Sequence, residues 1–64
     1  MEQRVLKFKY CNNTSKYVAD IKFCGGTVKE TTKLNKVGVY ITIVEPQGFM
    51  RKFRETRSQA FLLN

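Results

Sequence analysis

Apolar and polar side chains alternate along several stretches of this chain, and a period of two is typical of half-buried β-strands. In the first stretch Leu6, Phe8 and Tyr10 are separated by two lysines. The most apolar stretch reads VGVYITIV, and we expect it to be the central strand. The five predicted strands cover residues 4–10, 16–24, 27–33, 37–44 and 49–56.

One face of each apolar strand should form the core. The expected core residues are Leu6, Phe8 and Tyr10, then Tyr17, Ala19, Ile21 and Phe23, then Val39, Ile41 and Ile43. The third strand reads TVKETTK, which is β-branched but poorly apolar. This composition predicts an exposed edge strand, whose charged side chains disfavour pairing with strands of other molecules.

Turn signals separate the predicted strands. Gly25-Gly26 is the strongest, and it predicts a tight hairpin turn. Polar residues 11–15 predict a second turn. Residues 45–48 (EPQG) place Pro and Gly at the second and fourth positions of a type I turn. Gly38, inside a strand, indicates a bulge or a sharp bend.

The C-terminal part of the chain has two interpretations. Phe49 and Phe53 share the parity of a strand, whereas a helical spacing of three and four residues is shown by Met50, Phe53, Arg57, Ala60 and Phe61. We prefer a strand up to residue 56, because the turn before it favours a hairpin return. Residues 58–63 would then close as a short turn of helix or as a final strand.

Together these elements predict one mainly β domain over residues 1–64. Five short strands with tight turns are typical of a small SH3-like (Sm-like) antiparallel barrel, which hides its strand edges by closing. A β-β-β-β-α arrangement is the second choice.

Length and charge narrow the function. The chain has 64 residues, twelve Lys and Arg against five Asp and Glu, a net charge of +7 and a pI near 9.8. A core this small excludes a cofactor-binding α/β fold and a deep interdomain cleft. The excess of positive charge favours an anionic partner.

The composition offers little to catalysis. The chain has no histidine, which removes the commonest general base and the commonest neutral metal ligand. No spacing of the acidic residues predicts a paired acid and base. We therefore expect no enzymatic activity, no metal ion and no cofactor.

The sequence also indicates the cellular compartment in which we expect the protein. No apolar run approaches the length of a membrane span, and no signal peptide is evident. If residues 16–24 formed a hairpin strand, Cys11 and Cys24 would lie too far apart for a disulfide. We expect reduced thiols in a cytoplasmic protein, or in the host cytoplasm if a phage encodes the chain.

Three stretches resemble the WYL-type Sm-like barrels, a family that includes small stand-alone phage versions. Residues 23–29 are similar to the family's F…GT-V-R/K hairpin, and Val39-Tyr40-Ile41 keeps the central Tyr of its Trp-Tyr-Leu strand. Residues 48–57 (GFMRKFRETR) resemble its closing G-x-R-x-F-R-x-D-R strand, with Thr56 at the acidic position. The resemblance implies a barrel that senses a ligand or nucleic acid through Arg51, Arg54 and Arg57.

The candidate binding residues are cationic or aromatic. Residues 51–57 hold four cations and one anion, a pattern typical either of phosphate contact beside aromatic rings or of a solvated face. Strand parity points Lys52 and Arg54 outward and leaves Arg51 at the barrel rim. Lys7 and Lys9 extend this surface or guard an edge, and Tyr40 stacks on a base or covers the barrel opening. The predicted site is Arg51, Lys52, Arg54, Arg57, Tyr40, Lys7 and Lys9.

The sequence thus predicts a small basic barrel that binds nucleic acid, either DNA or RNA, through its C-terminal Arg/Lys strand. The alternative is a protein-interaction module that docks on an acidic surface of a host polymerase, nuclease or defence factor. An exposed apolar patch near Met50 or Leu62-Leu63 would favour that alternative.

Overall fold

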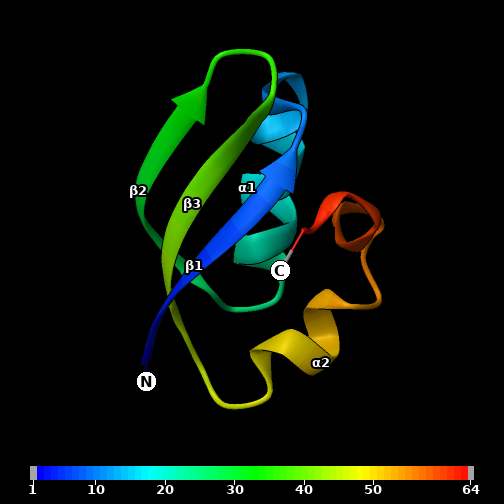
Figure 1. Ribbon diagram of the computed structural model, residues 1–64. Coiled ribbons are helices and arrows are strands. Elements are labelled where there is room, and N and C mark those ends of the chain that lie inside the picture. Colours follow the sequence, from blue (N-terminus) through cyan, green and yellow to red (C-terminus); the bar gives the residue numbers. More distant parts are fainter. Residues whose placement is uncertain (1, 64) are drawn as a thin grey trace.

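The computed structural model describes residues 2–63, which form a three-stranded antiparallel sheet with helices on one side (Figure 1). The strands lie in the order β1-β3-β2. The elements along the chain are β1 (Glu2–Lys9), the 3₁₀ turn η1 (Cys11–Asn13), α1 (Thr14–Phe23), β2 (Thr27–Leu34), β3 (Gly38–Glu45), α2 (Phe49–Phe53) and the 3₁₀ turn η2 (Arg57–Phe61).

The five-stranded SH3-like barrel predicted from the sequence is therefore wrong, as is the β-β-β-β-α alternative. The segments expected as the second and fifth strands are helical, and the three remaining strands form an open sheet. Helix α1 connects β1 to β2, which lie parallel to each other on either side of β3. This connection is a split β-α-β arrangement.

Helix α1 follows the spacing of its buried side chains. Tyr17, Ile21 and Cys24 are buried at steps of four and three residues, which places them on one side of a helix. Two residues that the strand interpretation placed in the core, Ala19 and Phe23, are exposed, and Phe23 retains 86% of its accessible surface. Residues 14–23 therefore form a helix and not the predicted strand.

Gly25-Gly26 ends α1 and does not form a hairpin turn. The amide of Gly25 donates to the Lys22 carbonyl, and the amide of Gly26 donates to the Ile21 carbonyl. This pair of bonds is a Schellman motif, in which the residue after the cap adopts a left-handed conformation that favours glycine. Gly25 has that conformation, with φ of 90°. The two glycines therefore interrupt the chain where the sequence predicted, but they end a helix and do not connect two strands of a hairpin.

In the C-terminal part the preferred strand is wrong, because residues 49–53 form α2 and residues 57–61 form η2, with a break between them. Phe49 and Phe53, four residues apart on α2, are buried and stack with a ring-centroid distance of 5.4 Å. After η2, Leu62 forms an isolated antiparallel bridge with Phe8, and the Leu63 amide donates to the Lys7 carbonyl over 2.7 Å. The end of the chain therefore lies against the outer edge of β1.

Several expectations for the strands are confirmed. Strand β3 is central, β2 is an exposed edge strand, and the alternation in β1 and β3 buries the expected apolar residues except Tyr10, which is 51% exposed. The irregularity expected at Gly38 lies elsewhere, since the β-bulge is in β2 between Val28 and Glu30. Gly38 is instead required because a Cβ there would collide with the backbone of Phe8.

All buried apolar side chains lie between the sheet and the helices. The core consists of Leu6, Phe8, Tyr17, Ile21, Cys24, Val39, Ile41, Ile43, Phe49 and Phe53. Phe8 connects the two layers, because its ring stacks on Tyr17 at 4.2 Å and meets Phe53 edge-on at 5.9 Å. Every helix in residues 2–63 lies on this side, and no element of this part of the chain covers the opposite side of the sheet.

The cysteines and helix lengths complete the description. Both thiols are free, and they lie at opposite ends of α1, Cys11 in η1 and Cys24 at the cap after Phe23. The two cysteines are therefore kept apart by the length of α1, and not by a hairpin as we expected. None of the helices in residues 2–63 has the length and hydropathy that crossing a bilayer requires.

Candidate nucleic-acid interface

The uncovered face of the sheet, which we call the open face, carries the outward residues of all three strands. Its membership follows from the strand register, because residues directly opposite each other in an antiparallel pair project to the same side. Moving along the sheet, the rows are Lys9–Gly38–Leu34, Lys7–Tyr40–Thr32, Val5–Thr42–Glu30 and Gln3–Val44–Thr27. The face is accessible, since Val5 is 42%, Tyr40 39% and Leu34 37% exposed.

Tyr40 and Lys7 meet at the centre of the open face. They are directly paired across β1 and β3, and the Lys7 ammonium lies 5.5 Å from the centroid of the Tyr40 ring. This separation is within the range of a cation–π contact. The two residues were predicted separately from the sequence, and the register brings them together.

Lys9 lies on the same face as Lys7, two residues further along β1. The only carboxylate of the open face in the described part of the chain is Glu30, which is on the far strand opposite Thr42. The β1 side of the face is therefore cationic. The Tyr40 ring therefore lies beside the Lys7 ammonium on a face that also carries Lys9.

The other four predicted site residues belong to a different surface. Arg51 and Lys52 lie on α2, Arg54 caps it, and Arg57 begins η2. All four are exposed, and within residues 2–63 none of them makes an ion pair. Because Phe53 of α2 packs on the core side of Phe8, this α2–η2 cationic surface lies in the helical layer, away from Tyr40. The closing strand expected to carry these cations does not exist.

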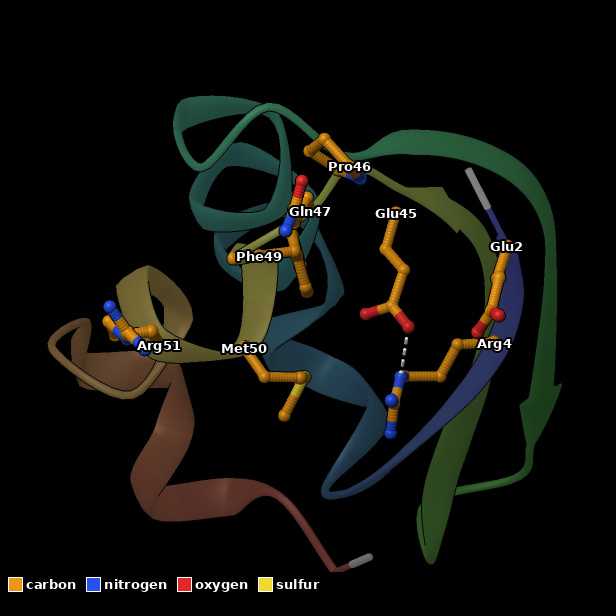
Figure 2. Close-up of a pocket in the computed structure, with 9 residues that line it drawn as sticks. Glu2, Arg4, Glu45, Pro46, Gln47, Phe49, Met50 and Arg51 are labelled. Carbon is orange, nitrogen blue, oxygen red and sulfur yellow. Dashed lines mark hydrogen bonds and ion pairs between the residues drawn. The ribbon is translucent and has the colours of Figure 1, made fainter.

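A shallow hollow of about 440 Å³ lies where β1, β3 and α2 converge (Figure 2). The Arg4 Nε donates to Glu45 Oε1 over 2.9 Å inside it, and Glu2 and Arg51 also line it. Two carboxylates balance the two guanidinium groups here. The hollow is therefore less suited to a phosphate than the β1 side of the open face.

The sequence interpretation missed several parts of this site. Thr32, Leu34 and Val5 flank the Lys7–Tyr40 pair, yet no sequence motif distinguishes them. Val5 and Thr32 lay on predicted strands and Leu34 just beyond one, but only the pairing register shows which strands share a face. Within residues 2–63 no group of three His, Cys, Asp or Glu side chains could hold a metal ion.

No protein-family model, curated protein or solved structure matches this chain. The functional argument therefore depends on the geometry of the open face and the charge of the chain.

Proposed function

We propose that this protein binds nucleic acid on the open face of its sheet. Tyr40 provides an aromatic surface, and Lys7 and Lys9 contact phosphates beside it. The α2–η2 cationic surface adds long-range attraction for the same polyanion. The observation that carries the proposal is the Lys7 ammonium 5.5 Å from the Tyr40 ring on a face that no helix covers.

Charge supports a polyanion as the partner. The net charge is +7, and the β1 side of the face holds two lysines with no carboxylate in their rows. Combining a cationic groove or surface with an exposed ring is the common way for proteins to hold nucleic acid without sequence preference.

Docking on an acidic protein is the second candidate, and the apolar surface does not favour it. Met50 and Leu62 are partly buried against the core, and Leu63 is 63% exposed, so one exposed side chain and not a patch is present at these expected positions. The most exposed apolar residues, Phe23 and Val37, lie at opposite ends of the sheet, at the end of α1 and in the β2–β3 turn. Tyr10 and Leu34 are also exposed and lie beside Val37, because the Tyr10 amide donates to the Val37 carbonyl and the Val37 amide donates to the Leu34 carbonyl. This small cluster is at the β2–β3 turn and not at Met50, where a patch favouring docking was expected.

The test is a salt titration of binding to a fluorescent oligonucleotide, followed by anisotropy. Lys7→Ala combined with Lys9→Ala should weaken binding and reduce the log–log salt slope by about 1.4, the amount expected for two phosphate contacts on a single strand. The matched control is Lys16→Ala with Lys22→Ala, which removes the same charge from α1. Equal losses in the two double variants, or no binding by the wild type at low salt, would contradict the proposal.

A further inference from the structure

We infer that the ligand of the open face is single-stranded nucleic acid, with an unpaired base stacked on the ring of Tyr40. This inference rests on the proposed function and names its substrate class. It follows from the surroundings of Tyr40, from the position of Lys7, and from what a duplex can offer to a flat protein face.

The surroundings of Tyr40 leave room for a planar ligand. Along β3, the neighbours on the same face are Gly38, which has no side chain, and Thr42. Across the sheet the ring has Thr32 on one side and Lys7 on the other. Only small side chains therefore surround the ring on three sides, and Tyr40 stays 39% exposed in the middle of the sheet.

Lys7 occupies the position that a base would take. A cation–π contact at an exposed site is weaker than the stacking of a base on an aromatic side chain. A base can therefore displace the ammonium from the ring. Because the lysine side chain is long and flexible, the displaced ammonium can reach the phosphate of the nucleotide whose base has replaced it.

A duplex cannot make this contact. The faces of its bases are already stacked on each other, so reaching Tyr40 would require unpairing and extrusion of a nucleotide. A duplex would be limited to the phosphate contacts of Lys7 and Lys9. The same face should therefore bind a single strand more tightly than a duplex at equal salt.

The experiment compares four proteins on three probes at one salt concentration. The probes are an oligothymidylate, an oligouridylate and a blunt DNA duplex, each with the same label. The proteins are the wild type, Tyr40→Leu, Tyr40→Phe and the control Tyr10→Leu, which changes a half-exposed tyrosine that follows β1.

We expect Tyr40→Leu to weaken single-strand binding by about 5- to 150-fold, the range that the loss of one stacked base gives. Its duplex affinity should change less than about twofold, and Tyr40→Phe and Tyr10→Leu should bind as the wild type does. Because the chain has three tyrosines and no tryptophan, quenching of tyrosine fluorescence by the single strand should be reduced in Tyr40→Leu. Comparison of the two single-stranded probes separates DNA from RNA.

The outcomes distinguish the inference from the proposed function. Equal affinity of the wild type for single strand and duplex, with Tyr40→Leu changing neither, overturns the inference and leaves the proposed function standing. Binding to none of the probes overturns both. Displacement of the single strand by polyglutamate at matched charge would also overturn the inference, because it would show a site that recognises acidic chains without stacking.

Discussion

Asp20 and Ser58 are joined by two hydrogen bonds, although 38 residues separate them in the chain. The Ser58 amide donates to Asp20 Oδ2 over 3.3 Å, and the Ser58 hydroxyl donates to the same oxygen. Ser58 is fully buried. This pair fixes η2 against α1 and so positions the segment that follows, where Leu62 meets Phe8 beside β1.

Removing the carboxylate should destabilise the fold. Asp20→Ala leaves the buried hydroxyl and amide of Ser58 without an acceptor, and we expect a loss of about 1–3 kcal/mol in the free energy of unfolding. Urea denaturation measures this loss. The control Glu30→Gln changes an exposed carboxylate on β2 and should stay within about 0.5 kcal/mol of the wild type. An Asp20→Ala protein as stable as this control would refute the role of the pair.

Phe23 and Phe53 provide a direct test of the fold. Phe23 is 86% exposed and Phe53 is fully buried. We therefore expect Phe23→Ala to change the free energy of unfolding by less than about 0.5 kcal/mol. Phe53→Ala should cost about 3–5 kcal/mol. In a barrel with residues 16–24 as a strand, Phe23 would point inward and its replacement would be as costly as that of Phe53. Chemical denaturation of the two variants decides between these folds.

Alkaline pH should weaken the core through Cys24. Burial, followed by the nearby Asp20 carboxylate, raises the pKa of the Cys24 thiol above its ordinary value of 9.0. The unfolded chain therefore loses this proton first as the pH rises. The stability that the neutral thiol contributes is complete below pH 9 and declines as the pH rises through and beyond 9.

The comparison with Cys24→Ala isolates this effect from the titration of the lysines. The difference in urea midpoint between the wild type and Cys24→Ala should be constant between pH 6 and 8 and should shrink above pH 9. A difference that grows with pH would contradict the assignment. Burial also raises the pKa of Tyr17 above 10.0, so the variant should retain an alkaline loss of its own.

The cations of the α2–η2 surface should act differently from those of the open face. We expect Arg54→Gln with Arg57→Gln to lower the affinity for single strand and duplex by the same factor, and we expect that factor to approach one as salt is raised. Anisotropy titrations at two salt concentrations measure it. A larger loss than that of the Lys7→Ala and Lys9→Ala double variant would place the main site on α2–η2.

The strands were predictable from the sequence where one period dominated. In β1 and β3 the alternation admits no helical interpretation, and the buried residues Leu6, Phe8, Val39, Ile41 and Ile43 are the expected ones. In residues 16–24 both periods fit, because Tyr17 and Ile21 belong to each. The two periods differ at Ala19 and in whether Phe23 or Cys24 is the next buried residue, and a phenylalanine that is 86% exposed is hard to expect from sequence.

The candidate site could be predicted only in part for a related reason. Lys7, Lys9 and Tyr40 were recognised as surface candidates on their own strands. That Lys7 lies opposite Tyr40 depends on a register between residues 33 positions apart in the sequence. Alternation fixes the face of each strand but not the alignment of two strands, which is set when the core and the Gly38–Phe8 approach form together.

The extra residue in β2 between Val28 and Glu30 affects more than the register of the sheet. The long free border of this molecule lies along that strand, and the irregularity interrupts its row of backbone donors and acceptors. A flat, regular edge strand can pair with the edge strands of other copies and so form fibrils. A bulge bends the strand and makes this pairing less favourable. The bulge thus reduces edge-to-edge association along β2, while residues 62–63 of the chain itself already cover part of the other sheet edge, at β1.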